Sequence, residues 1–189
     1  MKCCIDIKSG KAEPWAALQL AAYTLLNSYD VEFDEGAHLY KYKGKDVDSV
    51  TQILQAEEFI DMRWYDDWSR EKGKFVHLSI EYYLTGELDE ETLHPEIVPY
   101  LEAFKKFINE SGFMVEQSEI PQFNSTYCYA GKPDIYGHFP QPKAARRFAL
   151  ELNKEGKYKL IPYTDQNDFN VWLAAVAVHY WKKNNLKGK

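Results

Sequence analysis

The stretch that decides the fold is Cys3-Cys4-Ile5-Asp6-Ile7-Lys8, which is followed by Ser9-Gly10-Lys11. Its apolar residues predict a short strand over 3–8, and the Ser-Gly pair predicts a turn after it. Because residues i and i+2 of a strand point to the same face, Asp6 and Lys8 should project side by side, with Ile7 on the opposite face. A carboxylate can hold Mg²⁺, and an ammonium beside it can offset charge on a phosphoryl group. The simpler interpretation of an isolated Asp-x-Lys is a surface ion pair on an edge strand.

The composition is that of an ordinary globular protein. The 189 residues are 45% hydrophobic and 15% aromatic, which excludes a disordered chain and allows one sizeable domain. No run of about 18 apolar residues exists, so no membrane span is expected. Asp6 interrupts the apolar run that a secretory signal needs, so none is expected either.

The sequence has three cysteines, Cys3, Cys4 and Cys128, and this small, odd number excludes a disulfide scaffold. They predict a reducing, cytoplasmic compartment, and we expect them to pack in the sheet as small apolar residues. The net charge is −6, whereas a protein that simply coats DNA should be basic. An enzyme that gathers acids around a divalent metal is not excluded, because the metal supplies positive charge.

Hydrophobic periodicity predicts both helices and strands along the rest of the chain. Pro14 should open a helix that continues to Leu26. Further helices are expected to begin at Ser49 and to span 68–84, 96–110 and 168–183. Strands are expected over 30–34, 38–43, 113–121, 125–130, 133–139, 147–152 and 157–161. The resulting fold class is α+β, with a central mixed sheet flanked by helices in one domain.

Three further motifs carry polar groups that could serve the same chemistry. In Gly131-Lys132-Pro133-Asp134 an acid begins a short apolar strand, although an Asp after Pro is more often a turn residue. Gln19 and Tyr23 share one helical face, where they could also form a hydrogen-bonded core pair. Gly73 and His77 share a face of the 68–84 helix, where a histidine is usually structural.

Together, these motifs resemble the PD-(D/E)xK nuclease superfamily, most of all its RecB-like and phage RecE-like exonuclease branch. The resemblance covers nearly the whole chain and implies an α/β/α-like, restriction-endonuclease-like core. It implies Mg²⁺ as the cofactor, with Mn²⁺ as a substitute. The implied metal ligands are Asp6, the backbone carbonyl of Ile7, His77 as a ligand or gatekeeper, Asp134 and the accessory acid Glu119.

The same resemblance implies which residues act in catalysis. Asp6 and Asp134 are the implied catalytic acids, Lys8 is the implied catalytic lysine, and Gln19 and Tyr23 match a motif that follows the catalytic strand. Contacts with the DNA backbone are expected from basic residues, unless these are only solvated surface charges. The candidates are Lys41, Lys43, Lys45, Lys72, Lys74, Arg146 and Arg147.

The expected function is that of a Mg²⁺-dependent deoxyribonuclease, an exonuclease acting at the ends of linear duplex DNA in phage-type recombination or repair. The implied location is the cytoplasm of a bacterial or phage-infected cell. DNA is the expected partner, together with a single-strand annealing protein and further copies of the chain in a homo-oligomer. Two alternatives stay open: a catalytically decayed nucleic-acid-binding module, and a Mg²⁺-dependent phosphohydrolase of small substrates.

The order of the motifs departs from the family. The acid-x-Lys strand and the Gln-Tyr helix, residues 1–28, come first, whereas in the family they follow the strand that here carries Asp134. A genuine transposition, a strand exchanged between chains, or a numbering that does not follow the chemical chain would each explain this. We favour the numbering break, because a transposed unit must be threaded into the centre of the sheet through short connections.

Overall fold

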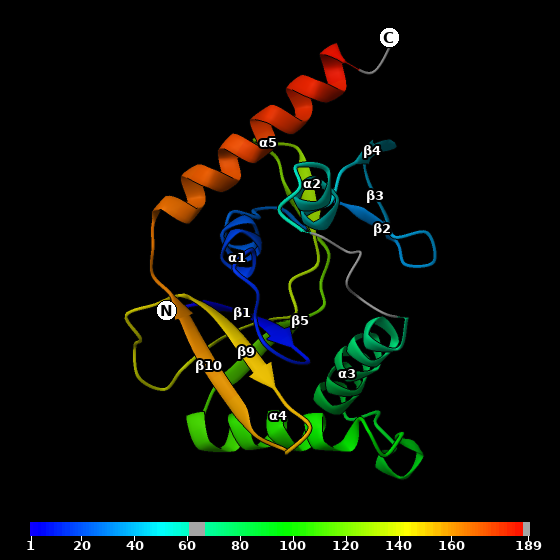
Figure 1. Ribbon diagram of the computed structural model, residues 1–189, viewed down its shortest axis with the longest axis vertical. Coiled ribbons are helices and arrows are strands. Elements are labelled where there is room, and N and C mark those ends of the chain that lie inside the picture. Colours follow the sequence, from blue (N-terminus) through cyan, green and yellow to red (C-terminus); the bar gives the residue numbers. More distant parts are fainter. Residues whose placement is uncertain (61–66, 187–189) are drawn as a thin grey trace. The chain divides into compact units, whose positions relative to one another are not determined.

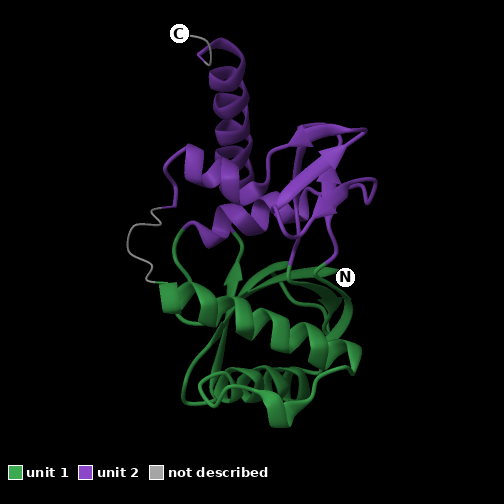
Figure 2. Ribbon diagram, turned by 90° about the vertical axis from the view of Figure 1, so that its right-hand side faces the viewer, with its two compact units in different colours: residues 1–14, 63–119, 134–164 green, residues 15–62, 120–133, 165–189 purple. Residues whose placement is uncertain are grey.

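The computed structural model describes residues 1–60 and 67–186, and the chain divides into two compact units. Figure 1 gives the order of the elements and Figure 2 the units in two colours. Unit 1 comprises residues 1–14, 63–119 and 134–164, and unit 2 comprises residues 15–62, 120–133 and 165–189. Each unit takes three separate stretches of the chain, so no single boundary in the sequence divides them. That residues 1–189 form a single nuclease domain stays a prediction.

Unit 1 is built on a five-stranded sheet with the order β10-β9-β1-β8-β5. Its strands are β1 (Cys3–Lys8), β5 (Met114–Ser118), β8 (Ile135–His138), β9 (Arg147–Leu152) and β10 (Tyr158–Tyr163). The central strand β1 runs parallel to β9 and antiparallel to β8, so the sheet is mixed. A central mixed sheet with flanking helices is the architecture that the sequence predicts.

Strand β1 is buried from Cys3 to Ile7, and only Lys8 at its end is partly exposed. Its central position explains this, because β8 and β9 flank it on either side and the side chains on both of its faces are buried. The interpretation of Asp6 and Lys8 as a surface pair on an edge strand is therefore wrong. Asp6 lies in the middle of the sheet with 1% of its surface exposed.

Two helices pack on unit 1's sheet, α3 (Asp67–Thr85) and α4 (Val98–Ser111). Their buried side chains join those of β1, β8 and β9 in one hydrophobic cluster, in which Phe104 and Phe107 are fully buried. A proline near the start of α4 and the left-handed Gly112 at its end bound that helix. Between the two helices lies a single 3₁₀ turn, Glu90–Thr92.

Unit 2 combines three helices with two small antiparallel sheets. The helices are α1 (Ala16–Thr24), α2 (Val50–Ala56) and α5 (Asn167–Asn185). One sheet contains β2 (Glu32–Asp34), β3 (Leu39–Tyr42) and β4 (Lys45–Val47), and the other contains β6 (Gln122–Asn124) and β7 (Tyr129–Gly131). Helix α5 contacts both α1 and α2.

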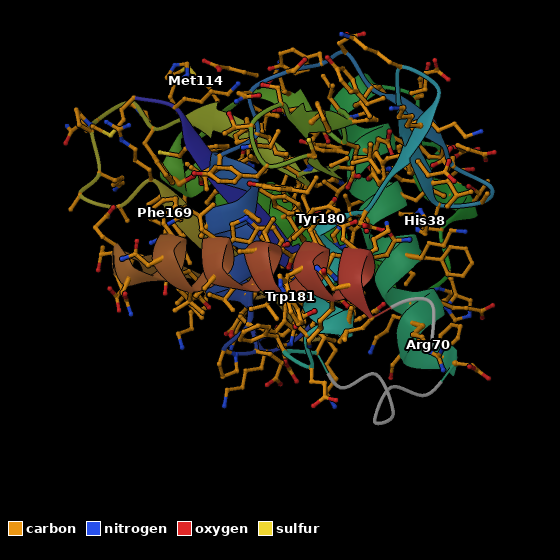
Figure 3. The ribbon with its side chains drawn as sticks, turned by 90° about the horizontal axis from the view of Figure 1, so that it is seen from above. His38, Arg70, Met114, Phe169, Tyr180 and Trp181 are labelled. Carbon is orange, nitrogen blue, oxygen red and sulfur yellow. The ribbon has the colours of Figure 1, made fainter. Side chains whose placement is uncertain are left out.

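Charged side chains fix helix α5 within unit 2. His179 Nε2 lies 3.1 Å from Asp48 Oδ2, Lys183 Nζ lies 2.5 Å from the same oxygen, and Lys182 Nζ lies 2.7 Å from Glu57 Oε2. Figure 3 shows Tyr180 and Trp181 on different sides of this helix. The Tyr180 hydroxyl donates to a backbone carbonyl at 2.5 Å, whereas Trp181 is 60% exposed.

The structure corrects the sequence expectations in three places. The strand expected over 125–130 is wrong in its first four residues, because residues 125–128 form the turn between β6 and β7. Asn124 Oδ1 stabilises that turn by accepting the N–H groups of the second and third residues after it. Cys128 in this turn is exposed, so only Cys3 and Cys4 are buried as expected. Strands β4 and β6 were not expected.

Strand β1 lies at the centre of the sheet and pairs antiparallel with β8. Ile5 pairs with Ile135, and Cys3 pairs with Gly137. This arrangement forms within one chain, so it needs no strand exchanged with a second molecule. The choice between a transposition and a numbering break stays a prediction. No helix among residues 1–60 and 67–186 has the length and apolar character to span a membrane.

The pairing of β8 with β5 depends on Gly137. Strand β5 has a bulge between Val115 and Gln117, next to which the two backbones approach closely. A Cβ on Gly137 would lie 2.1 Å from the carbonyl oxygen of Met114. Only glycine allows this backbone approach.

We expect Gly137→Ala to reduce the free energy of unfolding of unit 1 by about 3 kcal/mol or more, because backbone atoms must move. Urea denaturation measures this. Gly36→Ala is the control: the added methyl would lie 3.5 Å from Asp34 Oδ1, an ordinary contact, and should change stability by less than about 0.5 kcal/mol. Equal stability of the two variants would contradict the prediction.

Candidate functional site

Strand β1 supplies the first two residues of the site. Lys8 Nζ lies 2.7 Å from Asp6 Oδ2, and the side chains are 18% and 2% exposed. Among the described residues, this buried oxygen forms no hydrogen bond of good geometry besides that ionic contact. Water therefore screens the two charges poorly, and removing either side chain would leave the other charge without its partner in this ion pair.

Asp134 stands immediately before β8 and is directed at β1. The β1–β8 ladder ends at the pair Ile5 and Ile135, so the Ile7 amide two residues further lies beyond it. Asp134 Oδ2 accepts the Ile7 N–H at 2.5 Å and replaces the missing ladder carbonyl. This hydrogen bond holds the carboxylate beside the acid-x-Lys strand. The predicted role of the Ile7 carbonyl as a ligand stays a prediction.

His77 and Glu119 complete a cluster with Asp134. His77 Nδ1, from α3, lies 3.5 Å from Glu119 Oε1 and 3.5 Å from Asp134 Oδ1. One potential ligand atom of each of these three side chains lies within 4.8 Å of the others. Asp6 is outside this group of three, and its ligand role stays a prediction.

Glu119 occupies a backbone conformation that non-glycine residues rarely adopt, with φ 53°. It follows β5, and its N–H donates to the carbonyl of Asp134 at 3.0 Å. Such a conformation costs on the order of 1 kcal/mol and persists where its surroundings impose it. It directs the Glu119 carboxylate at His77 instead of along the strand.

The charges of the cluster perturb one another strongly. The pKa of Asp134 is raised to about 8: burial is the largest cause, Asp6 and Glu119 also raise it, and the positive charges of His77 and Lys8 oppose the increase. Burial alone would lower the pKa of His77, but the carboxylates of Asp134 and Glu119 raise it to about 9. The folded protein therefore retains protons on this cluster at a pH where the unfolded chain releases them.

These side chains fit a divalent cation. Two carboxylates are the hard oxygen ligands that Mg²⁺ and Mn²⁺ prefer, and an imidazole nitrogen can serve as a further ligand. Without a bound metal ion, the negative charge of these acids is offset by Lys8, by His77 and by bound protons. Glu119, Asp134 and His77 are the residues that would hold the metal.

Gln19 and Tyr23 both belong to unit 2. Gln19 Nε2 donates to the Tyr23 hydroxyl at 2.9 Å, and both side chains are buried. The Tyr23 ring packs on Gly131, where a Cβ would approach to 2.8 Å of a ring carbon. This is the hydrogen-bonded pair that the helical spacing allows. A catalytic part for the two residues stays a prediction.

Glu151 is a site neighbour that the sequence motifs did not reveal. It lies on β9 in register with Lys8, and its Oε1 accepts the N–H of Ala12 at 2.7 Å. It therefore anchors the segment that follows β1. An acid inside the apolar run 147–152 was the available signal, but only the pairing of β9 with β1 gives it meaning.

Comparison with protein-family models, curated proteins and solved structures finds no match to this chain. The functional argument therefore depends on the geometry and chemistry of the cluster.

The metal-free protein should gain stability when one acid of the cluster is neutralised. A group whose pKa is higher in the folded state than in the unfolded chain stabilises the protein at low pH, and this stabilisation is lost as the pH rises through the folded-state value. The pKa of Asp134 rises on folding from about 4 to about 8, and that of His77 from about 6.5 to about 9. We expect Asp134→Asn to exceed the wild type by on the order of 1–3 kcal/mol at about pH 8.5, and by less at about pH 5. The variant amide oxygen can still accept the Ile7 N–H.

Thermal and urea unfolding in EDTA at the two pH values measure this difference. Glu155→Gln, in the exposed turn between β9 and β10, is the control and should show no pH-dependent gain. A variant that is less stable than the wild type at both pH values would contradict the electrostatic account.

Mg²⁺ should stabilise the wild type, because a ligand that binds only the folded state shifts unfolding by mass action. Asp134→Asn should largely abolish this stabilisation, since a neutral amide is a poorer ligand for a hard cation. Titration calorimetry measures the same change directly. Equal Mg²⁺ affinity of the two proteins would remove Asp134 from the ligand set.

Proposed function

We propose that this chain is a metal-dependent deoxyribonuclease of the PD-(D/E)xK type, an exonuclease that hydrolyses phosphodiester bonds at duplex DNA ends. The observation that carries the proposal is the meeting of four separate segments of unit 1 in one cluster. An acid-x-Lys pair in the central strand lies beside an acid from the neighbouring strand, with a helical histidine and an accessory acid against it. The mixed sheet with β1 at its centre supports a restriction-endonuclease-like core.

Each residue has a role that its contacts support. When bound, a divalent cation acts as a Lewis acid on the phosphodiester and promotes ionisation of water. Glu119, Asp134 and His77 would hold that cation, and the Ile7 amide keeps Asp134 oriented toward it. Lys8, held by Asp6, would orient the attacking water and offset negative charge that develops on the phosphoryl oxygens.

The expected DNA contacts need one correction. Arg147 is 2% exposed and lies in β9 between β1 and β10, so it cannot reach a phosphate, and that expectation is wrong. Arg146, beside it, is exposed. With a net charge of −6, binding must depend on local basic residues together with the cation. An annealing protein and a homo-oligomer as partners stay predictions.

Incubation with linear and with closed circular duplex DNA tests the proposal. We expect degradation of the linear DNA in Mg²⁺ or Mn²⁺, none in EDTA, and an intact closed circle. Cleavage of the circle would make the enzyme an endonuclease. Binding of DNA without cleavage would favour the decayed binding module, and hydrolysis of small phosphate esters alone would favour the phosphohydrolase.

We expect Lys8→Ala to remove most cleavage, by about 10²-fold or more, while Mg²⁺ and DNA binding are largely kept. Because this change leaves the buried Asp6 without the positive charge of Lys8, the stability of the variant must be measured on the same sample. Lys8→Arg keeps a charge for Asp6 but changes the donor geometry, and it should also be strongly impaired. Lys154→Ala, in the exposed turn after β9, should cleave at the wild-type rate. A wild-type rate for Lys8→Ala would remove Lys8 from the mechanism.

A further inference from the structure

Helix α3 presents a third face that serves neither the core nor the metal cluster. Val76 and Ile80 are buried in the hydrophobic cluster, and His77 faces the acids. On the remaining face are Trp68, Phe75 and Tyr82, which are 41%, 46% and 42% exposed. Large aromatic side chains on an exposed helix face of this kind mark interaction sites.

This face forms one wall of a groove in unit 1. The opposite wall is the segment between α3 and α4, which contributes Leu88, Leu93 and Ile97 to the lining. The groove encloses a volume of about 470 Å³, within the range of ligand-binding pockets. It is therefore a formed apolar surface and not a set of scattered exposed side chains.

The spacing of the groove's aromatic residues suits a helical occupant. Trp68, Phe75 and Tyr82 are seven residues apart, with Leu78 between the last two. An apolar repeat of seven is the seam along which two helices pack side by side. From Trp68 to Tyr82 this seam is about 21 Å long, the length of about 14 helical residues.

The rim of the groove is acidic, which defines the charge of the occupant. The segment 86–97 contains five acids and no lysine or arginine. Glu90 pairs with Lys105 at 2.7 Å. The other four form no ion pair with any lysine or arginine of the described chain, and all four are exposed: Glu87, Asp89, Glu91 and Glu96. Glu87 and Asp89 line the groove itself, and Glu96 accepts a hydrogen bond from Trp68 Nε1 at 3.3 Å. This charge opposes a nucleic acid and attracts a basic protein segment.

We propose that the groove between α3 and segment 86–97 binds a basic amphipathic helix of a partner protein. The partner's apolar stripe packs along Trp68, Phe75 and Tyr82, and its lysines or arginines face the acidic rim. This is a helix-in-groove mode of recognition. The proposal does not depend on nuclease activity, because the groove shares no side chain with the metal cluster.

Fluorescence anisotropy with a labelled synthetic peptide tests this. The probe is a helical peptide of about 15 residues, with leucines in a heptad pattern and lysines beside them. A second peptide has glutamate at each lysine position. We expect saturable binding of the basic peptide, weaker at high salt, and at least tenfold weaker binding of the acidic one.

Two groove variants and two matched controls locate the site. Phe75→Ala should weaken the basic peptide by about tenfold, and Glu87→Lys by about fivefold with less salt dependence. Both side chains are exposed, so the fold should tolerate the changes. Met114→Ala, an equally exposed apolar residue on β5, and Glu155→Lys should stay within about twofold of the wild type.

Several results would overturn the proposal. The proposal is wrong if the basic peptide does not bind saturably, or if the acidic peptide binds equally well. It is also wrong if the groove variants and the controls bind the peptide with equal affinity, or if duplex DNA displaces the peptide. Sedimentation provides one more test. If the wild type self-associates and Phe75→Ala dissociates it, the groove is covered by a second copy of the chain instead.

Discussion

The hydrogen bond from the Ile7 amide to the Asp134 carboxylate joins the fold of unit 1 to its chemistry. It forms where the β1–β8 ladder ends, so strand register decides which carboxylate meets which amide. A slip of one residue would turn Asp6 and Lys8 to the other face of the sheet. The candidate site thus depends on a register that the whole apolar length of β1 maintains by burial on both faces.

Burial has an electrostatic consequence for the same residues. Asp6, Glu119 and Asp134 are acids drawn together in a place where water screens them poorly, and the structure offsets them with Lys8 and His77. Burial and the neighbouring acids raise the pKa of Asp134, and the carboxylates of Asp134 and Glu119 raise the pKa of His77. A cluster that binds protons this tightly is also one that a divalent cation can occupy, because both relieve the same repulsion. The left-handed backbone at Glu119 adds to the cost of this arrangement.

Helix α3 has three faces, each of which borders a different part of unit 1. Its period of 3.6 residues allows one face for the core, one for the acid cluster and one for the apolar groove. The low hydrophobicity of the helix as a whole follows from this division, since only one face is fully buried. A segment bound in the groove would pack against the helix that carries His77, so the groove and the candidate site share a structural support.

Local patterns in the sequence determined much of this protein. The run Cys3–Lys8 is a strand, Asp6 and Lys8 share one of its faces, and the helices and most strands lie within a few residues of their expected places, because period and turn residues act over short distances. Tertiary structure alone decided that β1 is central and not at an edge, that Arg147 is buried, that Glu151 anchors the segment after β1, and that segment 86–97 faces α3 across a groove. Each of these depends on which distant segment packs against which, and the free energy of that packing is a property of pairs of segments that no single stretch of sequence contains.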